Sequence, residues 1–246
     1  MKNFLLPEVP LLQAGPAPSL QTLPRQFRLS VWNFQKEKQP LWRQDFLSLC
    51  EQSDLFLAQE TRLDAPCTEA VAQSGLHWHA AISFLSPWGK YPTGIAAGCR
   101  APAQEIAFDA SAKEPFLTIP KMSMRLVYPL QQTQLLVINI HAVNFSTISP
   151  FKHHLEKAAS LVASFPGPVI VAGDFNAWNQ KRHTELLHMA ERLELKEVLF
   201  QPDLRTRYLH RTVDYIFVRG LKTVSSAVLE LASSDHRPLT AVLRLP

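Results

Sequence analysis

The chain has 246 residues, a formal net charge of +4 and an apolar content of 46%. This length suits one large α/β domain, and the apolar content is enough to build a buried core. No apolar stretch approaches the roughly 18 residues that a membrane helix needs, and no block of like charges forms a basic tail. The positive charge permits an anionic partner without identifying one.

The N-terminal segment, residues 1–27, is rich in proline. Four prolines up to Pro18 interrupt any hydrophobic run of the kind that a signal peptide carries, so we expect no export signal. We expect residues 1–27 to form an extended arm and residues 28–246 to form a single domain.

The cysteines (Cys50, Cys67 and Cys99) form no CxxC pair. This argues against disulfides and a zinc site, and favours a reducing, cytoplasmic compartment.

Apolar runs predict strands at 28–33, 55–60, 94–99, within 116–130, and at 134–143, 168–174, 213–220 and 239–245. Such runs are typical of strands that are covered on both faces. Region 80–130 contains no convincing helix and is expected to form consecutive antiparallel strands.

Helical spacing of apolar residues predicts helices at 40–52, 149–167 and 182–195. In the second helix Ser149 is the expected N-cap, and Pro166 with Gly167 marks its end. We expect His153 and His154 on the surface of this helix. The order of elements fits two sheets packed together with helices outside them.

Polar residues stand at the ends or beginnings of six predicted strands. They are Asn33, Glu60, His141 with Asn144, Asp174 with Asn176, Asp214, and Asp235 with His236. Polar residues after a strand are often only turn formers. If the last two strands run antiparallel to the others, however, all these groups reach one rim, which turn formation does not explain.

The chemistry of this rim points to a metal ion and a phosphate. Carboxylate and amide oxygens without cysteine suit Mg²⁺ or Mn²⁺ better than zinc. Mg²⁺ usually takes one or two protein carboxylates together with phosphate oxygens of a substrate, and Glu60 fits that role. A histidine beside an acid can act as a general base near neutral pH, and His141 and His236 are the candidates.

The ordered segments "VWN", "LAQET", "NIHAVNF", "AGDFNAW", "VDYIFV" and "SDHRPL" resemble the endonuclease/exonuclease/phosphatase superfamily. This superfamily includes DNase I, exonuclease III-like AP endonucleases, neutral sphingomyelinases and inositol polyphosphate 5-phosphatases. The resemblance spans about residues 28–245 and is closest to a bacterial subgroup, the YafD-like proteins. It implies a four-layered α/β/β/α sandwich of two mixed sheets, which agrees with the α/β arrangement expected from the pattern of elements.

The resemblance also implies a metal site. Glu60 resembles the principal Mg²⁺ ligand of the superfamily, and Asn33 resembles the amide beside it. Asp235 resembles a carboxylate on the metal side. The expected cofactor is therefore Mg²⁺, with Mn²⁺ as a substitute.

The remaining rim residues resemble the catalytic groups of the superfamily. Asp174 and Asn176 resemble the pair that positions the attacking water and the phosphate, and His141 resembles a histidine that contacts the phosphate. Asp214 resembles the acid that orients His236, the general base. Asp174 is the rival base, and the sequence leaves this choice open.

The implied reaction is hydrolysis of a phosphodiester, foremost in nucleic acid, by in-line attack of water. The basic segment with Arg205, Arg207 and Arg211, together with Asn144, is predicted to contact the substrate. A solvent-exposed basic loop without a ligand explains these arginines equally well.

Two alternatives stand beside the nuclease. One is a phosphoesterase for a phospholipid head group or a small phosphorylated metabolite, since the sequence contains neither a strong basic stripe nor a membrane-binding helix. The other is an inactive binding module. That reading predicts the loss of Glu60, Asp174 or His236, and all three are present. We expect a monomer.

Overall fold

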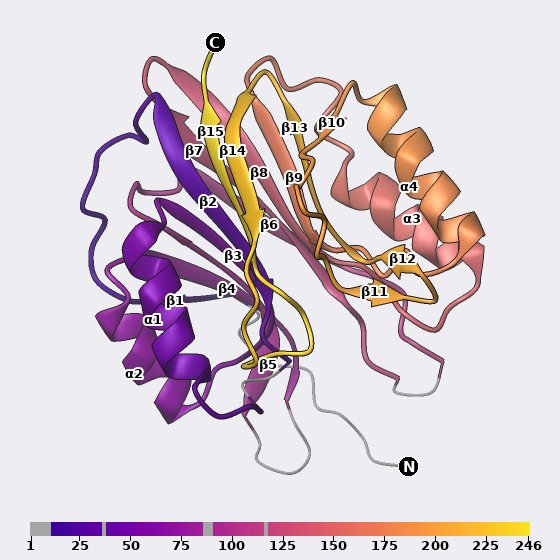
Figure 1. Ribbon diagram of the computed structural model, residues 1–246, viewed down its shortest axis with the longest axis horizontal. Helices are drawn as coiled ribbons and strands as arrows, with labels where there is room; N and C mark the ends of the chain where they lie inside the picture. The colour runs from indigo at the N-terminus through magenta and orange to yellow at the C-terminus, as the bar shows by residue number, and fades with distance from the viewer. Residues whose placement is uncertain (1–10, 36–37, 86–90, 116–117) are drawn as a thin grey trace.

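Two mixed β-sheets pack face to face, and helices cover the outer side of each (Figure 1). The computed structural model describes residues 11–35, 38–85, 91–115 and 118–246. The first sheet contains, in spatial order, β1 (Leu11–Ala14), β4 (His77–Leu85), β5 (Pro92–Cys99), β3 (Leu55–Arg62), β2 (Gln26–Asn33), β15 (Leu239–Arg244) and β14 (Lys222–Val228). The second contains β10 (Lys196–Glu197), β13 (Asp214–Arg219), β9 (Val169–Asp174), β8 (Thr133–His141), β7 (Met122–Leu130) and β6 (Glu105–Ala110).

The helices lie on opposite sides of the sheet pair. Helices α1 (Trp42–Gln52) and α2 (Ala65–Gln73) cover the first sheet, and α3 (Ile148–Ala158) and α4 (Gln180–Arg192) cover the second (Figure 1). A hairpin of β11 (Arg207–Tyr208) and β12 (Arg211–Thr212) forms a separate small sheet. The expected sandwich of two mixed sheets between helices is therefore confirmed.

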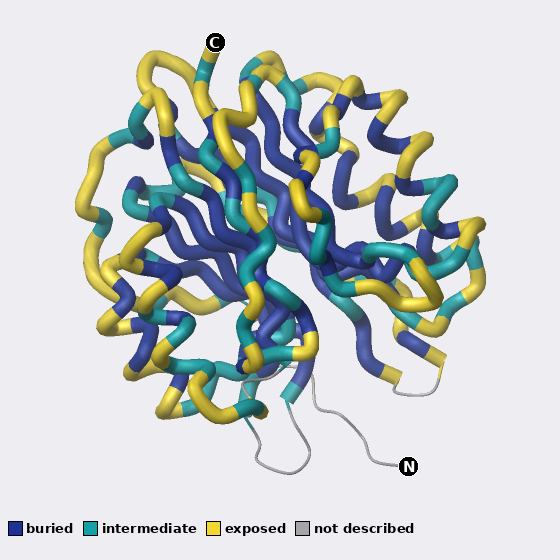
Figure 2. The backbone as a smooth tube through the Cα atoms, in the orientation of Figure 1, coloured by how far each residue is buried: buried dark blue, intermediate teal, exposed yellow. Residues whose placement is uncertain are grey.

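Side chains alternate along each central strand between two apolar layers. In β3, Leu55 and Leu57 join the core between the sheets, whereas Phe56 and Ala58 pack beneath α1 and α2. Figure 2 shows the strands buried in the middle of the molecule and the exposed residues on the helices and loops. This double coverage explains why the strands are nearly continuous apolar runs in the sequence.

Each strand that the sequence predicts has a counterpart at nearly the same residues. β4 pairs antiparallel with β5, and β6 pairs antiparallel with β7, as expected for region 80–130. Part of the N-terminal arm joins the body, because β1 extends the first sheet by pairing with β4. Residues 1–10 of the arm lie outside the described residues. Among the described residues, no helix combines the length and hydrophobicity needed to span a membrane.

The prediction for the second helix was wrong at both ends. α3 begins at Ile148 with Thr147 as its N-cap, not at Ser149. Pro150 falls within the first turn, where backbone N–H groups need no helical partner. The α-helix ends at Ala158, and from Ser160 onwards the chain continues in tight turns in which N–H groups bond to carbonyls three residues back.

His154 is buried rather than exposed, which corrects the expectation for this helix. Its side chain is 1% exposed, and it lies on the same apolar face of α3 as Phe151 and Leu155. Nδ1 accepts a hydrogen bond of 3.2 Å from the backbone N–H of Val143, in the loop after β8. Burial is the main cause that lowers the pKa of His154 to about 4, so the ring is neutral at pH 7.

We predict that His154 makes the fold sensitive to acid. The folded-state pKa lies below the ordinary value of 6.5. The contribution of His154 to the free energy of unfolding is therefore complete above pH 6.5 and is lost as the pH falls towards 4. The expected loss is about 3 kcal/mol. Urea unfolding between pH 7 and pH 4 should show a shallower pH dependence for His154→Leu than for the wild type. The exposed neighbour provides the control, since His153→Leu should keep the wild-type slope. Equal slopes for wild type and His154→Leu would contradict the prediction.

Candidate active site

Three neighbouring strands of the second sheet bring polar groups side by side at one rim. β8 and β9 run parallel with His141 opposite Asp174, and β13 runs antiparallel with Asp214 opposite the same Asp174. β15 likewise runs antiparallel to β2, so the loop before β15 reaches the end of β2 that carries Asn33. The two strand reversals on which the common rim depends are therefore present.

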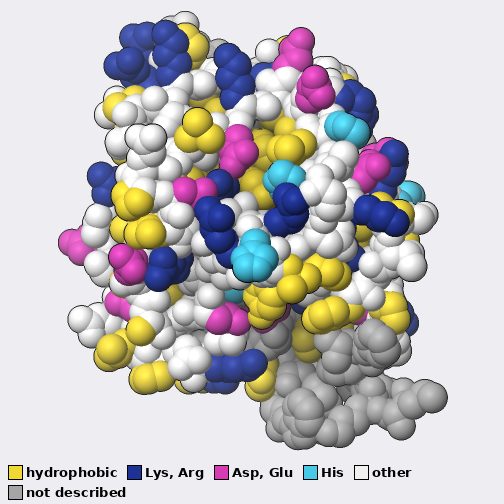
Figure 3. All heavy atoms as spheres, turned by 45° about the vertical axis from the view of Figure 1, so that its right-hand side comes forward, with side chains coloured by type: hydrophobic (Ala, Val, Ile, Leu, Met, Phe, Trp, Pro, Cys, Tyr) yellow, Lys and Arg dark blue, Asp and Glu magenta, His cyan; other side chains and the backbone are white. Residues whose placement is uncertain are grey.

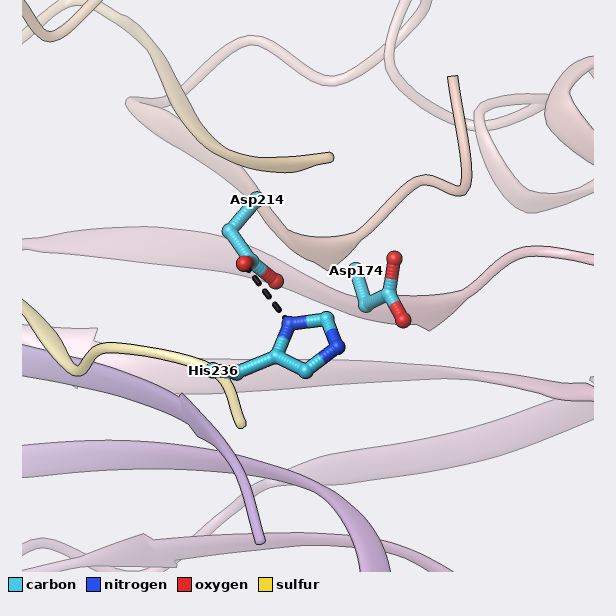
Figure 4. Close-up of side chains that lie close together, drawn as sticks. All are labelled: Asp174, Asp214 and His236. Atoms are coloured by element: carbon cyan, nitrogen blue, oxygen red, sulfur yellow. Dashed lines mark hydrogen bonds and ion pairs between the residues drawn. The ribbon is translucent and has the colours of Figure 1, made fainter. Parts of the chain in front are cut away.

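His236 lies in the loop before β15 and is held from two sides. Its Nδ1 is hydrogen-bonded to Asp214 Oδ2 at 2.8 Å (Figure 4). The indole Nε1 of Trp32 donates to the backbone carbonyl of His236 at 2.9 Å, and the His236 N–H donates to Ser234 Oγ at 3.1 Å. The Nε2 side of the ring faces Asp174 (Figure 4). The imidazole therefore has a fixed orientation with its outer nitrogen towards the rim.

Asp174 accepts hydrogen bonds from both sheets. Asn33 Nδ2, at the end of β2, donates to Oδ2 at 3.1 Å, and the backbone N–H of Asn176 donates to Oδ1 at 2.9 Å. His141 Nε2 lies 3.5 Å from Oδ2. Asp174 is 2% exposed, so these contacts fix its carboxylate in the floor of the site.

The backbone around Asp174 needs particular residues. Gly173 has a φ of 138°, and a Cβ there would lie 2.0 Å from the carbonyl oxygen of Ile140. Only glycine allows β9 to approach β8 this closely. Asn176 has a φ of 48°, and its Nδ2 donates to the carbonyl of Ala142 at 3.0 Å. Backbone strain of this kind is often concentrated at functional sites.

Burial and neighbouring charges shift the pKa of both central groups. Burial is the main cause that raises the pKa of Asp174 to about 7, and Asp214 raises it further while His236 opposes the rise. For His236, burial disfavours the charged ring, but the charge and hydrogen bond of Asp214 outweigh it. Together with Asp174 and Asp235, they raise the pKa of His236 to about 10. The stable arrangement at pH 7 is thus an imidazolium between two buried carboxyl groups.

Glu60 faces this group from the first sheet. Its Oε1 lies 3.8 Å from His141 Nε2 and 3.5 Å from Lys121 Nζ. His141 therefore stands between the carboxylates of Glu60 and Asp174. Asp235 lies at the edge of the site, where its Oδ2 accepts a hydrogen bond of 2.8 Å from Gln35 Nε2.

These residues share one cleft with a volume of 380 Å³. Eight of the predicted residues line it, namely Asn33, Glu60, His141, Asn144, Asp174, Asn176, Asp235 and His236. Asp214 is buried behind the ring of His236 and does not belong to the lining. Asn144 accepts a hydrogen bond of 2.8 Å from Trp178 Nε1, which orients both side chains at the cleft.

The three predicted substrate arginines lie outside the cleft lining. Arg205 is 8% exposed, and its guanidinium contacts Glu197 at 2.8 Å and Asp203 at 2.9 Å. Arg207 lies 3.7 Å from Asp203, and Arg211 contacts residues of α4. These positions do not support direct contact between the arginines and a phosphate in the cleft.

The donor set fits a hard divalent cation. The carboxylates of Glu60, Asp174 and Asp235 and the amide of Asn33 all face the cleft, whereas no cysteine lines it among the described residues. Ligand atoms of Asp174, Asp214 and His236 also lie within 4.8 Å of one another. In that trio, however, the 2.8 Å bond already joins Asp214 to His236 Nδ1. Glu60 is therefore the better candidate for the principal ligand of Mg²⁺ or Mn²⁺.

The sequence pattern missed several residues that shape the cleft. Lys121 precedes β7 and carries no motif that marks it. Arg182 is 1% exposed and donates from Nη1 to the carbonyl of Val143 at 2.7 Å and from Nη2 to that of Ser146 at 2.9 Å. Its Nη1 also lies 3.3 Å from the carbonyl of Asn176. Arg182 therefore braces the loops after β8 and β9 from within α4, although its helical position suggests a surface residue.

Comparisons with known proteins place the chain in a family. The sequence model of the endonuclease/exonuclease/phosphatase family matches residues 30–236. The chain belongs to this family. Its members are phosphoesterases, which makes a phosphate ester the expected substrate class.

A relative and two solved structures are similar to this chain. A UPF0294 protein of Photorhabdus laumondii is 35% identical over 222 residues, which cover 87% of this chain and 82% of the relative. The fold resembles an endonuclease/exonuclease/phosphatase of Beutenbergia cavernae with a TM-score of 0.69 and 15% identity, over 90% of this chain and 72% of that one. It also resembles ANGEL2, a 2′,3′-cyclic phosphatase, with a TM-score of 0.66 and 16% identity, over 96% and 98% of the two chains.

We predict that Asp214 controls the protonation of His236. In Asp214→Asn the ring loses both the carboxylate charge and the charged hydrogen bond, so the pKa of His236 should fall from about 10. The pKa is measured by NMR from the pH dependence of the imidazole nitrogen shifts, with His236→Gln used to assign the signal. A pKa in Asp214→Asn equal to that of the wild type would show that this pair is not coupled.

Proposed function

We propose that this protein is a Mg²⁺- or Mn²⁺-dependent phosphodiesterase that acts on nucleic acid. The observation that supports the proposal is the convergence of His236, Asp174 and Glu60 on one cleft from three distant parts of the sequence. A held imidazole, a buried carboxyl group and a hard-cation ligand are the components of metal-assisted phosphate ester hydrolysis. The family assignment supports the same reaction class.

We assign each group a role that its position supports. Glu60, with Asn33 and Asp235, would hold the ion, which would neutralise charge on the phosphate and on the leaving oxygen. His236 stays protonated at pH 7 and presents Nε2 as a hydrogen-bond donor to the phosphate oxygens. Asp174 accepts the proton of the attacking water, because a pKa of about 7 suits a base at neutral pH. This assignment selects Asp174 over His236 as the base.

The rim of the cleft supports nucleic acid as the substrate. Phe145 and Tyr208 line the cleft and are 58% and 57% exposed, and Trp178 also lines it. Exposed aromatic rings near a phosphate site suit stacking of nucleobases. Among the described lining residues, Lys121 alone is a lysine or arginine, and acidic and basic side chains are interspersed over the face in Figure 3. We infer recognition of one or two nucleotides rather than of a long phosphate backbone.

A phospholipid head group is the second candidate substrate. Leu209, at the tip of the β11–β12 hairpin, is 70% exposed and lines the cleft next to Tyr208. An exposed leucine and an exposed tyrosine at one tip also suit contact with a lipid surface. The cleft itself would bind the phosphodiester of such a lipid in the same way.

A substrate panel tests the proposal. Purified protein with Mg²⁺ or Mn²⁺ is offered single-stranded DNA, RNA, plasmid, abasic DNA, sphingomyelin and phosphoinositides. We expect hydrolysis of a single-stranded nucleic acid, abolished by EDTA, and a loss of roughly 10²- to 10³-fold in kcat for His236→Ala, which removes a donor to the phosphate. Glu60→Ala should lose activity at low metal concentration first, and Arg207→Ala, outside the cleft, is the control with near wild-type activity. Activity that survives both Glu60→Ala and His236→Ala would place the reaction elsewhere. Hydrolysis of the lipids alone would select the second candidate.

The pH dependence tests the assignment of the base. Asp174, with a pKa of about 7, must be ionised to accept a proton, so kcat/KM should fall as the pH drops below that value. His236, with a pKa of about 10, must be protonated to donate, so kcat/KM should fall again as the pH rises above that value. Asp214→Asn should move the alkaline limb to lower pH. The acid limb should move in the same direction by less, because Asp214 also raises the pKa of Asp174. If His236 were the base instead, kcat/KM of the wild type would keep rising until the pH reached about 10, with no acid limb near pH 7.

A further inference from the structure

Glu60 lies in the cleft although the alternation of its strand directs it elsewhere. In β3, Leu55 and Leu57 face the second sheet, and Phe56 and Ala58 face α1 and α2. Continued alternation would turn Glu60 towards the helices, on the same side as Phe56. Glu60 instead lines the cleft between the sheets.

The other rim residues on strands follow the alternation. Val31 precedes Asn33 by two residues, Ala172 precedes Asp174 by two, and Ile216 follows Asp214 by two. All three apolar residues belong to the core between the sheets. His141 follows Val137 of the same core by four residues. Their direction is therefore set by ordinary strand geometry. The direction of Glu60 needs a separate cause.

That cause is a β-bulge in β3. Ala58 pairs with Ala96, and the next pair is Thr61 with Gly94, so two residues of β3 oppose a single residue of β5. Glu60 also has a φ of 52°, in the left-handed region. The additional residue reverses the alternation and turns Glu60 towards the second sheet. A left-handed non-glycine residue is strained and persists only when its surroundings hold it.

A buried amide from the opposite sheet contacts this bulge. Asn139, on β8, donates from Nδ2 to the carbonyl oxygens of Ala58 at 3.1 Å and Ala96 at 2.8 Å, the last pair before the bulge. Its Oδ1 accepts a hydrogen bond of 2.7 Å from Gln59 Nε2, within the bulge. Gln59 and Asn139 are both 0% exposed.

We propose that Asn139 and Gln59 form a positioning bridge that sets the place of Glu60 in the cleft. Asn139 precedes His141 by two residues on the same face of β8, so the bridge fixes Glu60 relative to the histidine that lies 3.8 Å from it. The inference rests on the proposed function, in which Glu60 is the principal metal ligand. Neither amide is a catalytic residue, because both act through Glu60.

The energetics of the bridge favour positioning over general stability. Two primary amides buried between apolar layers lose their hydration, and their hydrogen bonds recover only part of that free energy. Gln59 Oε1 is buried and has no hydrogen-bond partner among the described residues, which adds to the cost. Apolar residues of similar volume would pack this space at lower cost. The bridge does, however, hold one strained residue in one orientation, as buried polar networks can do.

The metal affinity of bridge variants tests the proposal. Gln59→Met keeps the length of the side chain and removes its hydrogen bond to Asn139, and Asn139→Leu removes all three hydrogen bonds at similar volume. Mn²⁺ alone is titrated calorimetrically into each folded variant. We expect Gln59→Met to raise the Kd for Mn²⁺ about tenfold, and Asn139→Leu at least as much. Should Asn139→Leu fail to fold, Gln59→Met decides the question.

A matched control distinguishes an effect on the position of Glu60 from a general loss of protein stability. Ser30→Ala removes a buried hydrogen bond of 2.7 Å to Ser53 on the other face of the same sheet. It should lower Tm but leave the Kd for Mn²⁺ within about twofold of the wild type. In the Glu60→Gln background, Gln59→Met should have no further effect on the Kd, because the bridge acts through Glu60.

The outcomes distinguish this inference from the proposed function. If Glu60→Gln weakens Mn²⁺ binding but the bridge variants match Ser30→Ala, the positioning bridge is wrong and the metal site stands. If Gln59→Met adds its full effect in the Glu60→Gln background, the bridge acts on the whole site and the inference is wrong. If Glu60→Gln binds Mn²⁺ as tightly as the wild type, both the metal role of Glu60 and the bridge are wrong.

Discussion

The pairing register of β13, β9 and β8 is the constraint on which the rest of the cleft depends. It places Asp214, Asp174 and His141 opposite one another on three adjacent strands. Side chains alternate along a strand. A shift of the pairing register by one residue would therefore turn the polar residue at the end of that strand away from the cleft and into the apolar layer beneath the helices. The apolar cores on both faces of the second sheet fix this register, and Gly173 permits the close approach that it requires.

This register brings two buried carboxyl groups together, and a cation from the loop before β15 offsets their repulsion. Two buried carboxyl groups on neighbouring strands repel each other when both are ionised, and burial adds to the penalty. The imidazolium of His236 compensates for it, and the indole of Trp32 holds the backbone of that residue in place. Arg182, on α4, holds the loops after β8 and β9 in place by donating hydrogen bonds to their backbone carbonyls. The cleft is therefore held together by Trp32 from the first sheet, Arg182 from α4 and His236 from the loop before β15.

The sequence predicted strands that are apolar on both faces and helices with a clear apolar stripe. It missed elements whose own residues show no such pattern. The apolar runs around Leu57 and Val171 identified central strands, because such strands are covered on both faces. Helix α2 was missed although Asp64 caps it and a proline stands in its first turn, since its nine residues carry a weak apolar stripe. β14 was missed because it is a polar, mostly exposed edge strand. His154 stands three residues after Phe151 and four before Ala158, so helical spacing places it on the buried face of α3, and only its polarity suggested the surface.

The residues of the candidate site also differ in how far the sequence pattern predicts their position. For Asp174, Asp214 and His141, strand ends and strand direction are enough to predict a shared rim, and the structure contains that rim. Glu60 differs, because alternation alone assigns it to the helix side of β3. Its position at a strand end placed it on the expected rim, and the resemblance of its motif to a known family marked it as the principal metal ligand. The bulge that redirects it depends on Asn139, a residue 79 positions further along the chain and in the other sheet. A local pattern cannot report such a dependence, since the strained residue and the group that holds it meet only after both sheets have formed.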